Sequence, residues 1–169
     1  MDALQSVQKV IPLTEELALG VKKSPLLESP TGKVIKYFEG QPHLQASYDL
    51  HESAQLLLKP HTKGFLSEVE VRKLIHEAGL PTFPKPEGIP DNFRVRITEK
   101  GGGMEYVHPD HTHTIIRVMP GKPHSEFSSQ QTPYVIQMIN GNTMDKFGNI
   151  TSFRSTESHI PLNEFNFSG

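Results

Sequence analysis

A segment rich in proline and glycine at residues 81–90 divides the sequence into two parts with different hydrophobic patterns. Five of its ten residues are Pro or Gly, so it can neither continue a helix nor enter a central strand, and we expect an extended connector. Before it, apolar residues recur at helical spacing, whereas after it short alternating runs are separated by turn residues. The sequence therefore predicts an α+β protein in which N-terminal helices precede an antiparallel β-sheet.

We divide the chain accordingly into a helical N-terminal region at 1–80, a Pro-rich connector at 81–92 and a sheet domain at 93–169. A length of 169 residues is enough for one domain or for two small ones. The connector is either a flexible hinge or a strap that Phe83 and Ile89 pin to a surface. The sequence pattern leaves both interpretations open.

The N-terminal region is predicted to contain three helices and one strand. The helices are expected at 14–20, 47–59 and 67–78, and the strand at 33–38, after a turn at 29–32. Pro60 ends the second helix, which carries one apolar stripe. The stripe consists of Leu50, Ala54, Leu57 and Leu58.

The helix at 67–78 has the clearest sequence signals. Ser67 and Glu70 form the capping-box pattern at its start, and Gly79 stands where the residue after the C-terminal cap is expected. Its buried face is expected to consist of Val71, Leu74, Ile75 and Ala78.

The part of the chain after the connector is predicted to form a β-meander. Strands are expected at 93–97, 104–108, 112–119 and 132–139. Asn140 and Gly141 tolerate positive φ and form the strongest hairpin signal in the sequence, and residues 147–149 form a further turn. A short helix is expected near 161–164.

Composition excludes several classes of protein. The chain contains no Cys, which rules out a disulfide scaffold, a thiol nucleophile and a Cys-ligated metal site. A formal net charge of -2 argues against nucleic-acid binding over the whole surface. No apolar run is long enough to span a bilayer, and the first residues lack the basic and apolar parts of a secretory signal. We therefore expect no membrane segment and no signal peptide.

A basic, histidine-rich patch is the densest polar feature of the sequence. Four of the nine His lie within residues 108–124. Five basic and three acidic residues give residues 93–124 a formal charge of +2, so the remainder of the chain carries -4. This local charge is typical of a site for an anionic substrate.

Metal-independent cleavage of RNA is one reaction that such residues can perform. It needs a base for the 2′-hydroxyl proton, an acid for the leaving 5′-oxygen and a cation beside the phosphorane. The pKa of histidine suits the first two roles, and the planar guanidinium of arginine suits the third. We take as catalytic candidates His108, His111, Arg117 and His124, which we expect to converge on one groove, with no metal and no cofactor. Lys122 and Arg96 are candidates for binding the substrate, although Arg96 also fits a solvated strand face.

Two other interpretations remain open. His108, His111 and His113, with the carboxylate of Asp110, have a spacing that zinc or non-haem iron accepts, so the protein is alternatively a metal-dependent enzyme. It is alternatively a non-enzymatic protein-interaction module whose His-rich loop is only a surface feature. His51 is expected on the surface of its helix.

Three aromatic residues are candidates for stacking on bases: Phe127, Tyr134 and Phe147. We favour a core position for Phe147 and leave Tyr134 open.

Four segments of the second half resemble a known family. They are GGMEYVHP at 102–109, VMPGKPH at 118–124, QTPYV at 131–135 and NGNTMDKFGN at 140–149. Together they resemble the C-terminal toxin modules of bacterial polymorphic toxin systems, which end large haemagglutinin-repeat or RHS-repeat proteins. The resemblance covers about residues 93–150, just over a third of the chain.

Such modules are often similar to the barnase–EndoU–colicin–RelE group of ribonucleases. The resemblance implies N-terminal helices followed by a twisted antiparallel β-sheet, and a metal-independent endoribonuclease that cleaves tRNA or another RNA. It adds Gln131 and Tyr134, which open the next strand, to the substrate-binding candidates Lys122 and Arg96. It also implies a cognate immunity protein and action in the cytoplasm of a target or host cell.

Overall fold

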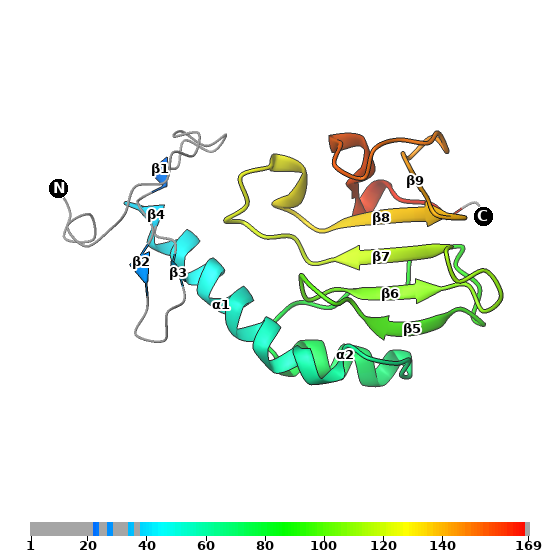
Figure 1. The fold of residues 1–169 in the computed structure, drawn as a ribbon, viewed down its shortest axis with the longest axis horizontal. Coiled ribbons are helices and arrows are strands. Elements are labelled where there is room, and N and C mark those ends of the chain that lie inside the picture. Colours follow the sequence, from blue (N-terminus) through cyan, green and yellow to red (C-terminus); the bar gives the residue numbers. More distant parts are fainter. Residues whose placement is uncertain (1–21, 24–26, 29–33, 36–37, 168–169) are drawn as a thin grey trace.

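The computed structural model describes residues 22–23, 27–28, 34–35 and 38–167. Two helices, α1 (Pro42–Leu58) and α2 (Glu68–Glu77), precede a six-stranded antiparallel sheet, which confirms the α+β class (Figure 1). The strands of this sheet are β5 (Arg94–Ile97), β6 (Met104–Val107), β7 (Ile115–Met119), β8 (Tyr134–Ile139), β9 (Asn142–Met144) and β10 (Ile160–Pro161). Their order is β10-β8-β7-β6-β5, and β9 also pairs with β8.

Short elements complete the described part of the chain. Two antiparallel pairs precede α1. They are β1 (Lys22–Lys23) with β4 (Phe38–Glu39), and β2 (Leu27–Glu28) with β3 (Val34–Ile35). Single 3₁₀ turns are η2 (Lys59–His61), η3 (Ser128–Gln130), η4 (Thr156–Ser158) and η5 (Leu162–Glu164), and the last of these lies where a tail helix was expected. The helix predicted at 14–20 and the turn predicted at 29–32 lie outside the described residues, and the strand predicted at 33–38 is described only at 34–35 and 38.

Helix α1 begins earlier than predicted and buries only part of the predicted apolar stripe. Pro42 occupies its first position, where the missing N–H of proline costs no helical hydrogen bond. Ala54 and Leu58 are buried as expected. Leu50 and Leu57 were predicted to be buried but are 41% and 59% exposed. The helix contacts the rest of the protein along a narrower stripe, whose buried residues are Leu44, His51, Ala54 and Leu58.

Helix α2 agrees with its sequence signals. The Oγ of Ser67 accepts a hydrogen bond from the backbone N–H of Glu70 at 3.1 Å, and Gly79 follows the helix with a φ of +95°. The expected face packs into the core, with Val71, Ile75 and Ala78 buried and Leu74 partly buried.

The cap at Ser67 yields a stability prediction. Replacing Ser67 by Ala should lower the free energy of unfolding by about 1 kcal/mol, because the N–H of Glu70 loses its acceptor. Ser53→Ala is the matched control, since Ser53 is exposed within α1 and alanine favours helix there. Urea denaturation should show the loss for Ser67→Ala only; equal midpoints for both variants would contradict the role of the cap.

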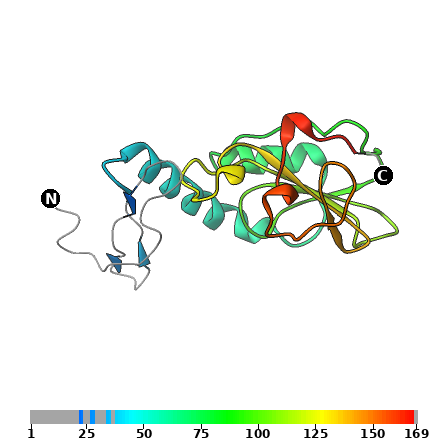
Figure 2. The same cartoon turned by 90° about the horizontal axis from the view of Figure 1, so that it is seen from above.

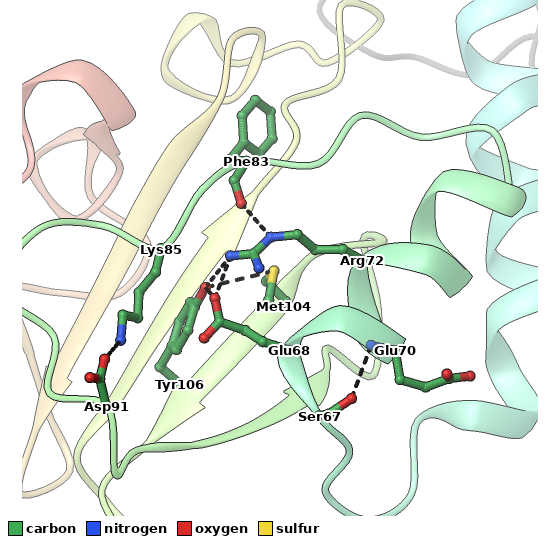
Figure 3. Close-up of polar contacts among 9 residues, drawn as sticks. All are labelled: Ser67, Glu68, Glu70, Arg72, Phe83, Lys85, Asp91, Met104 and Tyr106. Carbon is green, nitrogen blue, oxygen red and sulfur yellow. Dashed lines mark hydrogen bonds and ion pairs between the residues drawn. The ribbon is translucent and has the colours of Figure 1, made fainter.

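The connector is a pinned strap rather than a hinge. Arg72 of α2 donates from Nε to the carbonyl oxygen of Phe83 at 2.9 Å, and Ile89 is buried in the core. The same guanidinium donates from Nη2 to the hydroxyl of Tyr106 at 3.0 Å and to the carboxylate of Glu68 at 2.5 Å. Figure 3 shows these contacts meeting between α2 and β6. Burial raises the pKa of Tyr106. This partly buried polar cluster joins α2, the strap and β6.

One hydrophobic core contains residues from both sides of the strap. It combines Ala54 and Leu58 of α1 and the buried face of α2 with one face of the sheet. The sheet contributes Val95, Ile97, Met104, Tyr106, Ile116, Val118 and Val135. Because side chains alternate across a strand, the residues between these positions lie on the opposite face of the sheet. That opposite face carries the polar residues described below.

The turn between β8 and β9 has the predicted geometry. Asn140 and Gly141 have φ values of +51° and +85°, as a two-residue hairpin requires. Within the ranges that the structure describes, no helix is long and apolar enough to cross a membrane.

Candidate functional site

The centre of the sheet face opposite the core holds two arginines on either side of one carboxylate. The antiparallel register places Arg96 of β5 opposite Glu105 of β6, and Glu105 opposite Arg117 of β7. The Nε of Arg96 donates to one oxygen of Glu105 at 2.7 Å, and the Nε of Arg117 donates to the other. The Glu105 side chain is only 5% exposed, whereas both arginines are about a third exposed.

This arrangement leaves donors available for a ligand. A guanidinium has five N–H donors, and each arginine uses only its Nε on Glu105. Among the described residues, no hydrogen bond uses the terminal Nη groups of Arg96 or Arg117. The buried carboxylate compensates one of the two positive charges and holds the two guanidinium planes in place, so the triad keeps a net charge of +1.

The triad lines a groove of about 540 Å³ on the sheet face. Lys63 and Lys100 add two ammonium groups to its wall, and Thr62 and Thr98 add hydroxyls. Glu99 is the one further carboxylate lining the groove, whose formal charge is therefore +2. We call it the arginine groove; its charge and donor geometry suit a phosphate.

A second hollow, of about 240 Å³, lies between α1 and the segment 120–131. His124 is held there, with its Nδ1 3.0 Å from the Oγ of Ser47 and its ring edge-on to that of Tyr48. Lys122 also lines this hollow, which we call the histidine cleft. Burial lowers the pKa of Lys122, and the nearby carboxylate of Glu52 opposes that shift. Gly101 lines the histidine cleft and Lys100 lines the arginine groove, so the β5–β6 turn separates the two.

His51 is a residue of this cleft that sequence reasoning misplaced. It was expected on the surface, but it is buried, with Nδ1 2.9 Å from the carbonyl oxygen of Ser47 and Nε2 3.0 Å from that of Gly121. Gly121 has a φ of +80°, and a Cβ there would lie 2.5 Å from the carbonyl carbon of Thr132. His51 therefore fastens a tightly packed turn to α1. Its spacing from Ala54 and Leu58, three and seven residues, was the signal that could have found it.

His108 and His111 lie at the opposite end of the sheet from His124. They follow the end of β6, whereas His124 follows the end of the antiparallel β7 (Figure 1). The Nδ1 of His108 accepts the backbone N–H groups of Asp110 and His111, both at 3.0 Å, which closes a turn. The expected meeting of His108, His111, Arg117 and His124 in one groove is therefore not found: Arg117 lies in the arginine groove, His124 in the histidine cleft and the other two in an exposed loop.

The remaining substrate-binding candidates divide between the two hollows and the interior. Arg96 lies in the arginine groove and Lys122 in the histidine cleft. Gln131 donates from Nε2 to the carbonyl oxygen of Ser125 at 2.9 Å, within the segment beside the cleft. Tyr134 is buried, which raises its pKa, and its ring lies 4.9 Å from that of His159. Because it is buried, the Tyr134 ring has no free face on which an RNA base could stack.

Phe147 was predicted to belong to the core but is 78% exposed. It lies in the turn that follows β9, which is closed by a hydrogen bond from the Gly148 N–H to the Asp145 carbonyl oxygen, and it is not part of the core cluster. Phe127, at the rim of the histidine cleft, is also exposed.

The metal-ligand arrangement considered for His108, His111 and His113 is not assembled. Across residues 38–167 and the short described strands before them, no group of three or more His, Asp or Glu side chains is placed to hold a metal ion.

Comparison with models of protein families, with curated proteins and with solved structures found no match to this chain. The function is therefore inferred from the geometry of the two hollows.

Proposed function

We propose that the protein is a metal-independent endoribonuclease of the toxin class and that the arginine groove binds the scissile phosphate. The observation that supports this most is the pair of guanidinium groups held by one buried carboxylate, in a groove bordered by two lysines. Fixed guanidinium groups suit the non-bridging oxygens of a phosphate and stay charged at any working pH.

The proposed reaction is an internal transesterification. The 2′-oxygen of the RNA attacks phosphorus, the bond from phosphorus to the 5′-oxygen breaks, and a 2′,3′-cyclic phosphate forms. Arg96 and Arg117 stabilise the charge that grows on the non-bridging oxygens. Glu99, the other carboxylate that lines the groove, accepts the 2′-hydroxyl proton, while Lys63 or Lys100 supplies the proton for the 5′-oxygen.

This proposal changes the roles that the sequence suggested for histidine. His124 and Lys122 lie across the β5–β6 turn from the groove, so we assign them contacts with RNA beyond the scissile phosphate. His108 and His111 have no proposed catalytic role.

The proposed partners are RNA, including tRNA, and a cognate immunity protein, with the cytoplasm of a target or host cell as the place of action. A protein that covers the arginine groove should be acidic, because complementary charge speeds association and fixes the register of the complex.

Cleavage of RNA in excess EDTA tests the proposal. Purified protein should cut single-stranded RNA and leave 2′,3′-cyclic phosphate ends, and DNA of the same sequence should stay intact because it lacks the 2′-hydroxyl. RNA that is cut only when a divalent metal is added would favour a metal-dependent enzyme.

A non-enzymatic interaction module is the second candidate, because large apolar side chains are exposed together after β9. Phe147, Ile150 and Phe153 are each more than 60% exposed within seven residues. Intact RNA under all conditions, together with loss of partner binding in Phe153→Ser, would favour this function.

A further inference from the structure

A stacked arginine–phenylalanine pair stands next to the arginine groove along β5. The Cζ of Arg94 lies 3.8 Å from the ring centroid of Phe65, and the Cζ of Arg96 lies 5.3 Å from it. Phe65 is held beside this edge strand because Leu66, the next residue, bridges to Val95, with its N–H 2.9 Å from the Val95 carbonyl oxygen. The ring therefore lies beside the edge strand, against the guanidinium groups of Arg94 and Arg96.

Arg94 offers a charged, planar surface that the fold does not use elsewhere. Its side chain is exposed, and no ion pair within the described residues involves it. One side of the guanidinium faces Phe65. Together with Ser67, Asp91 and Phe93, the pair lines a further hollow of about 350 Å³. Unpaired RNA bases stack on such guanidinium planes and aromatic rings.

The distance along the strand suits neighbouring nucleotides. Arg94 and Arg96 lie two residues apart on the same face of β5, which places them about 7 Å apart along the strand. A phosphate bound by Arg96 and Arg117 therefore has a stacking surface within reach of the next nucleotide. In a duplex the base would have to leave its stack first, so the arrangement selects unpaired RNA.

We propose that the protein recognises single-stranded RNA by stacking a base on the Arg94–Phe65 pair while the adjacent phosphate occupies the arginine groove. This inference rests on the proposed ribonuclease function and specifies its substrate. Arg94 is a specificity residue that acts through its plane as well as its charge, and Phe65 keeps that plane in position.

Binding of uncleavable ligands separates stacking from charge. The probes are fluorescein-labelled 2′-O-methyl hexauridine and an abasic hexamer with the same phosphates, measured by fluorescence anisotropy. Arg94→Lys retains the charge and loses the plane, and Phe65→Leu removes the supporting ring. Both variants should weaken binding of the hexauridine roughly 5- to 100-fold and leave binding of the abasic hexamer unchanged. For Arg94→Lys the salt dependence should not change, because the number of phosphate contacts is kept.

The chain provides a matched control. Arg154 also lies over a phenylalanine ring, that of Phe153, at 5.4 Å, but outside the residues that line the groove. Arg154→Lys should bind both probes like the wild type. Equal losses on both probes for Arg94→Lys, no loss on either, or failure of the wild type to bind the hexauridine more tightly than the abasic hexamer would overturn the inference. Failure of the proposed ribonuclease function would show separately, as RNA left intact in EDTA, because neither probe can be cleaved.

Discussion

Replacing Arg117 by Ala should lower the rate of RNA cleavage in EDTA by about 100- to 1,000-fold, the range observed when one fixed donor to a developing oxyanion is removed. Arg117 donates to Glu105 and lies about a third exposed in the groove, so its loss removes a positive charge from the position proposed for the phosphorane. Single-turnover kinetics on a labelled oligoribonucleotide measure the effect.

Two further variants separate this role from general charge and from folding. Arg117→Lys should recover only a small part of the rate, because an ammonium cannot bind Glu105 and a phosphate oxygen through one planar fork. Arg154→Ala removes an exposed arginine elsewhere and should cleave like the wild type. Equal rates for Arg117→Ala and Arg154→Ala, with unchanged melting temperatures, would remove the arginine groove from the mechanism.

Replacing Ile116 by Ala should lower the free energy of unfolding by about 4 kcal/mol. Ile116 is fully buried on the core face of β7, so truncation loses buried apolar surface and leaves a cavity. For a chain of this size the melting temperature should fall by roughly 8 to 16 °C. Chemical denaturation followed by circular dichroism gives the free energy directly.

Phe147→Ala is the matched control for that variant. It also removes a large apolar side chain, but one that is 78% exposed, so a change of less than about 0.5 kcal/mol is expected. A loss below about 1 kcal/mol for Ile116→Ala, or comparable losses for both variants, would show that the core does not lie on this face of the sheet.

Elements with local signals were predictable from the sequence. The cap at Ser67, the end of α2 before Gly79 and the turn at Asn140 each depend on residues within a few positions. The alternation of apolar and polar residues was likewise enough to locate β5, since its buried and exposed positions follow one another along the chain.

The burial of α1 was not predictable in the same way. Leu50 and Leu57 have helical spacing, but only contacts with the segment 120–131 and the β5–β6 turn decide which side of α1 is covered. His51 is buried because Gly121, seventy residues away, supplies a carbonyl acceptor. No local pattern contains that information.

The candidate site shows the same division. Arg96 and Arg117 were identified from the sequence as cations on strands, but Glu105 was missed because its role depends on the register of three strands. The separation of His108 from His124 was available in principle, because residues after consecutive antiparallel strands lie at opposite ends of the sheet. The two histidines are close in the sequence, but the antiparallel pairing of β6 and β7 keeps them apart in the structure.

The most direct test of the account is to observe the arginine side chains while a ligand binds. In ¹⁵N-labelled protein, NMR signals of the Nε–Hε groups can be followed as 2′-O-methyl hexauridine is added. Binding in the arginine groove predicts that the signals of Arg96 and Arg117 shift with a common saturation curve while that of Arg154 stays in place. Unchanged Arg96 and Arg117 signals, with shifts confined to the rings of His51 and His124, would place the ligand in the histidine cleft and contradict the account.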